Sequence, residues 1–221
     1  MTSGGKPGLR DAYGVSTPAD NIRLYARWAA SYEQDFVAAN GYVLHRRVAE
    51  QLAGHQPDRA APVLDVGCGT GIGGMALREL GFRVIDGVDI SGAMLGLARS
   101  KHMPDGSAVY RGLYEADLTG AALNSVQGYR GIVTAGTFTH GHLGPASLQR
   151  LWQVASPGAV AAIGINARHY AVEGFASVLN AAATAGSIDI IEIVEVDIYE
   201  RPPADLGPEN RRAKVAVCRV R

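Results

Sequence analysis

The sequence predicts a doubly wound α/β fold in which a mainly parallel, seven-stranded sheet carries helices on both faces. Short apolar runs alternate with helical patterns from residue 62 onward, which is typical of strand-helix-strand units. Hydrophobic residues make up 47% of the chain and charged residues 19%, which is a globular composition. The last two apolar runs are joined by residues 201–212, a segment too short for a helical crossover, so we expect an antiparallel final strand.

The chain is expected to form one domain, because 221 residues are enough for a single substantial core. Residues 1–15 are rich in small residues and are expected to be disordered. The single domain is then residues 16–221. Within it, residues 16–55 are predicted to be a helical lid and residues 60–221 the α/β core.

The predicted lid begins with a recognisable helix start. Thr17 is expected to be the N-cap, Pro18 the first helical residue, and Asp20 the acidic residue three positions after the cap. A second helix is predicted after a break at Asn40 and Gly41.

Apolar patterning defines the elements of the core. The predicted strands are residues 62–67, 83–90, 109–118, 131–138, 158–166, 188–200 and 213–221. The predicted helices between them are residues 73–80, 91–101, 145–155 and 170–185.

Composition also narrows the class of partner. Lys and Arg together number 21, as do Asp and Glu, so no overall field attracts nucleic acid and small molecules are the expected partners. No apolar run approaches the roughly 20 residues that a membrane span needs. The N-terminus lacks the apolar core of a secretory signal and the two cysteines lie far apart, so the predicted location is cytoplasmic.

A glycine-rich loop is the strongest functional signal. Gly67, Gly69 and Gly71 follow the first predicted core strand and open a helix, so the backbone can turn tightly and approach a ligand closely. Asp89 ends the second strand about 20 residues later, where a carboxylate can accept both hydroxyls of a ribose. Together these residues predict a cofactor that contains adenosine.

The glycine pattern alone does not identify that cofactor. Gly69, Gly71 and Gly74 also satisfy G-x-G-x-x-G, the dinucleotide fingerprint, and Asp89 suits NAD as well. Asp65 stands two residues before the first glycine, where a carboxylate would repel a pyrophosphate and suits a cationic amino group. The loop charge therefore favours S-adenosylmethionine over NAD.

Four segments resemble the class I S-adenosylmethionine-dependent methyltransferases. Residues 64–71, LDVGCGTG, are similar to motif I of that family, and residues 87–99, GVDISGAMLGLAR, to its ribose-binding motif and helix. YEADL at 114–118 and LWQVASPGA at 151–159 extend the resemblance, which covers about residues 25–166. It implies a Rossmann-like methyltransferase fold, S-adenosyl-L-methionine as cofactor, and S-adenosyl-L-homocysteine as product.

The resemblance also implies a cofactor site. Its members would be Tyr25, Trp28, Tyr32, Asp65, Gly67, Cys68, Gly69, Gly71, Asp89, Ile90, Met94, Asp117, Leu118, Ala135 and Gly136. In this reading Asp65 and Gly67 face the methionine amino end and Asp89 the ribose. Asp117 faces the adenine amine, Ile90 and Met94 pack on the adenine, and Ala135 and Gly136 form the floor beneath the sulfonium.

Several of these residues have a structural alternative. Asp117 could cap the turn at Thr119 and Gly120, and Met94 has ordinary helical packing in either reading. Cys68 has no base positioned beside it by the sequence and is interpreted as a small packed residue.

Two further segments point to a subgroup within the family. Residues 23–36 are similar to a Tyr and Trp segment that folds over the cofactor, although its aromatic residues are equally consistent with helix packing. Residues 136–145 resemble a small-molecule subgroup named for the Williams-Beuren chromosome region. The implied partner is a small-molecule methyl acceptor with an oxygen, nitrogen or sulfur nucleophile.

His140 and His142 are the candidate catalytic residues, because they follow the fourth strand at the ligand edge of the sheet. A hydroxyl acceptor needs proton removal, which a histidine can perform. Hydrogen bonding within the loop is the structural alternative. A metal is not predicted, because the sequence shows no third ligand nearby.

Two other functions stay open. An NAD-linked oxidoreductase of the short-chain type is disfavoured, because none of the three lysines stands four residues after a tyrosine. A catalytically inactive cofactor-binding scaffold would keep the same glycines and Asp89. The sequence does not indicate an oligomeric state.

Overall fold

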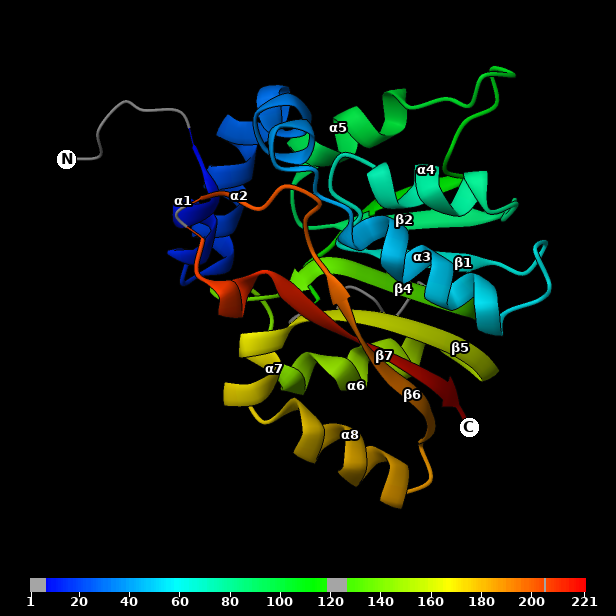
Figure 1. Ribbon diagram of the computed structural model, residues 1–221. Coiled ribbons are helices and arrows are strands. Elements are labelled where there is room, and N and C mark those ends of the chain that lie inside the picture. The colour runs from blue at the N-terminus through cyan, green and yellow to red at the C-terminus, as the bar shows by residue number, and fades with distance from the viewer. Residues whose placement is uncertain (1–6, 119–126, 205) are drawn as a thin grey trace.

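Seven strands form one sheet at the centre of the computed structural model, which describes residues 7–118, 127–204 and 206–221 (Figure 1). The strands are β1 (Val63–Val66), β2 (Ile85–Asp89), β3 (Gly112–Glu115), β4 (Tyr129–Phe138), β5 (Ala155–Asn166), β6 (Ile188–Asp197) and β7 (Arg212–Val220). Their order is β3-β2-β1-β4-β5-β7-β6. The first five pair in parallel, whereas β7 runs antiparallel between β5 and β6. The predicted fold class is confirmed.

Helices cover both faces of the sheet. Those of the core are α3 (Leu44–His55), α4 (Ile72–Glu79), α5 (Gly92–Ser100), α6 (Leu148–Val154), α7 (Ala167–Val172) and α8 (Phe175–Thr184). Helices α3 to α5 lie on one face and α6 to α8 on the other (Figure 1). Along β1, Val63 packs into the first of these layers, and Leu64 and Val66 pack into the second. A strand buried on both faces is apolar throughout, which explains the short runs in the sequence.

The N-terminal end is more ordered than expected. Residues 1–6 lie outside the described part of the chain, but α1 (Leu9–Tyr13) is a short helix where disorder was predicted. Ala12 and Val15 are buried against the core. Burial of these two apolar side chains stabilises a segment whose small residues alone predict disorder.

The predicted lid helix starts as expected. Helix α2 (Pro18–Trp28) is capped by Thr17, whose side chain accepts a hydrogen bond from the Asp20 amide at 3.1 Å. A 3₁₀ turn, η1 (Ala29–Ser31), and a π-helical segment, η2 (Glu33–Ala38), continue it. The break then comes at Gly41, which has a φ of 56°, and α3 follows.

Two of the predicted core helices are subdivided in the structure. The helix expected at 170–185 is divided into α7 and α8, because Gly174 adopts a left-handed φ of 79° between them. The helix expected at 145–155 begins with a 3₁₀ turn, η4 (Pro145–Ser147), before α6. A second 3₁₀ turn, η5 (Pro208–Asn210), precedes β7.

The residues that the structure describes include no helix that is both long and apolar enough to span a membrane.

Candidate functional site

A pocket of about 220 Å³ lies at the carboxyl ends of β1, β2 and β4. Strand β1 stands between β2 and β4, so the chain order reverses here, and this is where doubly wound sheets bind ligands. The lining residues come from these strand ends and from the N-terminal segment. They are Ser16, Thr17, Pro18, Asn21, Tyr25, Tyr32, Tyr42, His45, Asp65, Gly67, Cys68, Gly69, Thr70, Ile72, Gly73, Asp89, Ile90, Met94, Asp117, Leu118, Ala135, Gly136, Thr137, Gly141, His142 and Leu143.

The turn from β1 to α4 forms one wall of this pocket. Gly67 and Gly69 have left-handed φ values of 70° and 54°, a conformation that favours glycine. A Cβ at Gly67 would lie 2.1 Å from Thr137 Oγ1, so the turn passes directly against the end of β4. At Gly69 a Cβ would meet no atom within 4 Å. The Gly69 backbone therefore borders open space.

Two other glycines of the motif serve packing. Gly71, predicted to bind the cofactor, is absent from the pocket lining. A Cβ at Gly71 would lie 3.2 Å from the Ala98 backbone, and one at Gly74 would lie 2.4 Å from the Tyr110 ring. These glycines let α4 lie close to its neighbours, which is a structural role.

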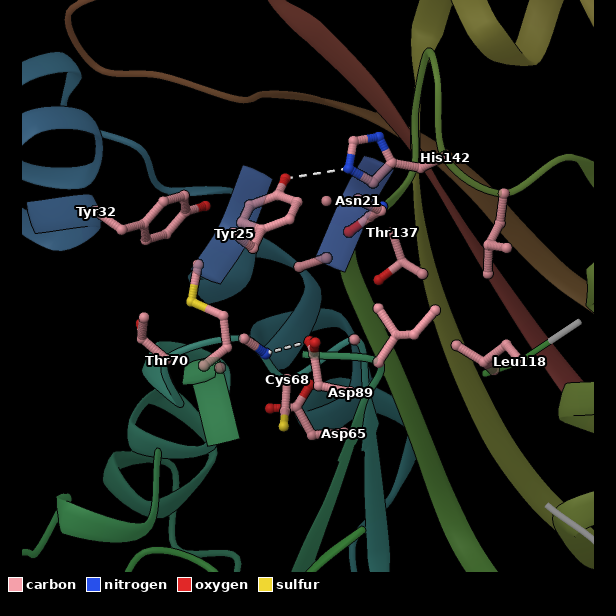
Figure 2. Close-up of a pocket in the computed structure, with 18 of the residues that line it drawn as sticks. Asn21, Tyr25, Tyr32, Asp65, Cys68, Thr70, Asp89, Leu118, Thr137 and His142 are labelled. Carbon is pink, nitrogen blue, oxygen red and sulfur yellow. Dashed lines mark hydrogen bonds between the residues drawn. The ribbon is translucent and has the colours of Figure 1, made fainter. Parts of the chain in front are cut away.

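Asp89 lines the pocket directly beside the glycine turn (Figure 2). Its Oδ2 accepts a hydrogen bond from the Gly69 amide at 2.8 Å, and its Oδ1 accepts one from the Ser91 amide at 2.8 Å. Burial raises the pKa of this carboxyl, and the backbone hydrogen bonds oppose that rise. Each oxygen keeps a lone pair for a ligand, as a ribose site requires.

Asp65 also reaches the pocket but is not an unpaired anion. Its side chain is buried, and Oδ2 accepts a hydrogen bond from the Tyr110 hydroxyl at 2.7 Å. Burial raises the pKa of Asp65 to about 7, although the Tyr110 hydrogen bond lowers it. The carboxyl is thus about half protonated at neutral pH. The sequence argument that treated it as a fixed negative charge was too simple.

The remaining core residues predicted to bind the cofactor are found around the pocket. Ile90, Met94, Asp117, Leu118, Ala135 and Gly136 all line the pocket. The alternative role of Asp117, capping a turn at Thr119 and Gly120, falls on residues outside the described ranges. Cys68 lines the pocket as well, and burial raises the pKa of its thiol well above the ordinary value. It is a packed thiol, not a nucleophile.

The aromatic segment supplies two rings to the pocket. Tyr25 and Tyr32 line it from above the glycine turn (Figure 2). Trp28 does not reach it: the ring is 2% exposed and packs on Tyr32, with ring centroids 5.1 Å apart. Trp28 instead lines a second, smaller pocket beside the first.

The structure separates the two candidate histidines. The Nδ1 of His142 lies 3.0 Å from the His140 carbonyl oxygen, and its Nε2 lies 3.1 Å from the Tyr25 hydroxyl (Figure 2). A carbonyl only accepts, so the neutral ring carries its proton on Nδ1, and Tyr25 donates to Nε2. Burial lowers the pKa of His142, which favours this neutral form.

His140 lies away from the pocket. Its ring contacts Tyr13 and His169, with centroids 5.6 Å and 5.2 Å away. In the part of the chain that the structure describes, no three His, Cys, Asp or Glu side chains are grouped as metal ligands.

Sequence reasoning missed several lining residues, of which Thr70 and His45 are the most informative. Both are at least nine-tenths buried. Thr70 Oγ1 and His45 Nδ1 have no hydrogen-bond partner among the described residues. A buried polar atom left unpaired costs roughly 1–3 kcal/mol, so each has hydrogen-bonding capacity that the described protein atoms do not use. Thr70 lies inside the glycine motif and could have been noticed there, whereas no motif marks His45.

Comparisons with known proteins place these residues in a family context. Residues 63–158 match the family described as a methyltransferase domain. Methyltransferase-like protein 27 of Homo sapiens is 39% identical over 94 residues, which are 42% of this chain. The match spans only 38% of the length of that relative.

Solved structures share the fold. A TehB-like SAM-dependent methyltransferase from Corynebacterium glutamicum superimposes with a TM-score of 0.60 at 19% identity, covering 90% of this chain and 100% of that one. Magnesium protoporphyrin IX methyltransferase from Synechocystis PCC 6803, with bound SAH, gives a TM-score of 0.63 at 14% identity, covering 91% and 95% of the two chains. At these identities the likeness concerns the fold.

Proposed function

We propose that this chain, a class I S-adenosylmethionine-dependent methyltransferase by its domain match and its fold, methylates an oxygen, nitrogen or sulfur atom of a small molecule. The class I assignment made from the sequence is confirmed, and the subgroup stays a prediction. One observation carries the proposal: the open Gly69 turn and Asp89, joined by a hydrogen bond of 2.8 Å, line the same pocket at the switch point of the sheet.

The residues present fit S-adenosylmethionine. This cofactor supplies a methyl group on a sulfonium, which is already activated for in-line displacement. Asp89 would accept the ribose hydroxyls, Met94 and Ile90 would pack on the adenine, and Asp117 would accept from its amine. The protein has to orient the acceptor and exclude water, so no base is obligatory for every acceptor. Residues 16–55 are proposed to close over the cofactor as a lid.

The amino-acid end of the cofactor carries an ammonium group and a carboxylate, and each of them needs a polar partner in the pocket. Its ammonium group would lie by Asp65, where a cation favours the ionised carboxylate. No Lys or Arg is found among the described residues that line the pocket. The carboxylate would therefore be held by Thr70 and His45, whose polar atoms lack partners.

The comparisons weigh against only one of the two rival functions. The domain match and the fold favour a methyltransferase over an NAD-linked oxidoreductase. A catalytically inactive scaffold would bind the same cofactor and differ only in turnover. Calorimetric titration of S-adenosylmethionine, S-adenosylhomocysteine and NAD, followed by a labelled-methyl screen of small acceptors, separates these functions. Saturable binding of NAD without S-adenosylmethionine would contradict the proposal.

Asp89→Ala is expected to weaken binding of S-adenosylhomocysteine by at least about tenfold, because hydrogen bonds to a charged group contribute roughly 1.5–3 kcal/mol. Asp89→Asn keeps one acceptor oxygen, so its affinity for S-adenosylhomocysteine should lie between those of Asp89→Ala and the unmodified protein. Calorimetry measures both affinities. Asp105→Ala is the matched control: this exposed carboxylate also accepts a backbone hydrogen bond, from Ser107, but lies outside the pocket. Equal losses at both positions would count against a ribose role.

Cofactor affinity is expected to fall as the pH drops below 7. The pKa of Asp65 is about 7, and a bound ammonium favours the ionised form, so binding releases a proton from the protonated fraction. Affinity then decreases by up to about tenfold per pH unit below this value. Calorimetry in buffers of different ionisation enthalpy measures the proton release.

Two comparisons test that assignment to Asp65. Asp65→Asn should bind more weakly and lose the proton release. 5′-Methylthioadenosine lacks the amino-acid end, so its binding should release no proton. Proton release that persists in Asp65→Asn would assign the titration to another group.

A cytoplasmic location, and the absence of a nucleic-acid substrate, remain predictions from the charge balance and the N-terminal sequence.

A further inference from the structure

A second pocket of about 50 Å³ adjoins the first and has a different character. The two share Tyr25, Tyr32, Tyr42, Gly136 and His142. A ligand in the second pocket would therefore meet a ligand in the first at this common wall.

The second pocket carries no formal charge on its walls. The rest of its lining consists of Leu9, Ala12, Tyr13, Trp28, Phe36, Leu44, Phe138, Thr139, Asn166, Ile198 and Tyr199. None of the described residues around it is Asp, Glu, Lys or Arg, and the lowered pKa of His142 favours its neutral form. An ionised ligand would lose its hydration there without gaining a counter-charge.

Two buried donors in this lining have no acceptor. Asn166 is 3% exposed and caps α7, where its Oδ1 accepts a hydrogen bond from the His169 amide at 3.1 Å. That bond fixes the orientation of the amide group, and Nδ2 is left unpaired within the described structure. Trp28 is 2% exposed, and its Nε1 also has no hydrogen-bond acceptor among the described residues. Both atoms only donate, so each can donate to an acceptor atom that the described protein atoms do not supply.

We propose that the second pocket receives the methyl acceptor, and that this acceptor is a small, uncharged hydroxy compound with a neighbouring carbonyl group. The carbonyl oxygen accepts hydrogen bonds from Trp28 and Asn166, and the hydroxyl lies at the common wall beside His142. This inference rests on the proposed methyltransferase function and names its substrate class. A dry cavity of about 150 Å³ holds benzene, so the second pocket takes a group of only a few heavy atoms.

The chemical step balances without a further reactant. The hydroxyl oxygen forms a bond to the methyl carbon as the bond from that carbon to sulfur breaks, and the sulfur keeps the electron pair as a thioether. The hydroxyl proton passes to His142 Nε2, the ring nitrogen that carries no proton in the neutral form. The Tyr25 hydroxyl donates to Nε2 at 3.1 Å in this structure. The acceptor hydroxyl would replace it as the donor to that nitrogen.

Three probes of nearly equal size test the substrate class on protein saturated with S-adenosylhomocysteine. Glycolamide is neutral and has the carbonyl group. Glycolate has a charged carboxylate in place of the amide, and 2-methylpropan-1-ol has an apolar branch with two methyl groups in its place. Saturation-transfer NMR should show glycolamide binding at least about tenfold more tightly than either of the others. Equal or tighter binding of glycolate or 2-methylpropan-1-ol would overturn the proposal.

Variants locate the binding to the two donors. Asn166→Asp keeps the oxygen that caps α7 but removes the donor, and Trp28→Phe removes the indole N–H, so each should reduce glycolamide binding at least about tenfold. Asn180→Asp and Trp152→Phe make the same exchanges outside both pockets and should not change it. Thermal melts identify a variant that fails to fold, in which case the other donor variant carries the test.

The affinity of the same samples for S-adenosylhomocysteine distinguishes failure of the proposed methyltransferase function from failure of the proposed substrate class. If the unmodified protein does not bind S-adenosylhomocysteine, the proposed function itself is contradicted. Normal S-adenosylhomocysteine binding, with glycolamide binding unchanged in both donor variants, would contradict only the substrate class. A crystal structure in which both donors hold water that glycolamide does not displace would overturn it as well.

Discussion

Gly69→Val is expected to reduce the affinity for S-adenosylmethionine by about fivefold to a hundredfold, because inserting atoms into a filled site costs roughly 1–3 kcal/mol. The backbone at Gly69 borders open space in the pocket, so a branched side chain would occupy the volume of the ligand. Its left-handed φ of 54° adds strain for any residue with a Cβ. Calorimetry with S-adenosylhomocysteine measures the loss.

A matched variant separates the two causes. Gly106 has a φ of 82°, and a Cβ there would also meet no atom within 4 Å, but it lies outside both pockets. Gly106→Val therefore introduces comparable backbone strain without filling the site. It should lower the melting temperature while leaving the cofactor affinity intact. If Gly69→Val binds as well as the unmodified protein, the cofactor lies elsewhere.

His142→Gln is expected to lower kcat by about a hundredfold to ten-thousandfold for a hydroxyl acceptor, which is the usual contribution of a general base. The cofactor affinity should change far less, because none of the proposed cofactor contacts involves His142. The pH profile provides a second readout. Burial lowers the pKa of His142 below its ordinary value of 6.5, so the base form persists as the pH falls. The acid limb of kcat should therefore lie below pH 6.5.

Two comparisons make the His142 result interpretable. His102→Gln changes an exposed histidine outside both pockets and should leave kcat unchanged. Tyr25→Phe removes the hydroxyl that now donates to His142 Nε2, so the base stays available and kcat should fall far less than in His142→Gln. Undiminished turnover in His142→Gln would show that no base acts there and would favour an amine or thiolate acceptor.

Local sequence patterns predicted those parts of the site that depend on local chemistry. Thr17 forms the helix cap that its position before Pro18 indicated. Gly67 and Gly69 form the turn after β1, and Asp89 stands at the end of β2, where it accepts a hydrogen bond from that turn. Each of these features is determined by residues close in the chain, so a single sequence is enough to recognise it.

Features that depend on distant contacts could not be predicted in the same way. The sequence alone suggested that Asp65 is a free anion, whereas in the fold the Tyr110 hydroxyl lies 2.7 Å from its carboxylate oxygen. His140 and His142 are two residues apart, yet only His142 lines the pocket. The second pocket is the clearest case, because Trp28 and Asn166 lie far apart in the sequence and no local pattern indicates that they line one pocket.

The place of β7 between β5 and β6 has a consequence for synthesis on the ribosome. Within the described sheet, β6 pairs with β7 alone, and β7 is made after it. While β7 is still being translated, β5 and β6 both carry unpaired backbone edges, and such edges readily pair with other chains. We therefore expect the chain to be most prone to aggregate before β7 is made, and the arrival of β7 pairs the facing edges of β5 and β6 in a single event.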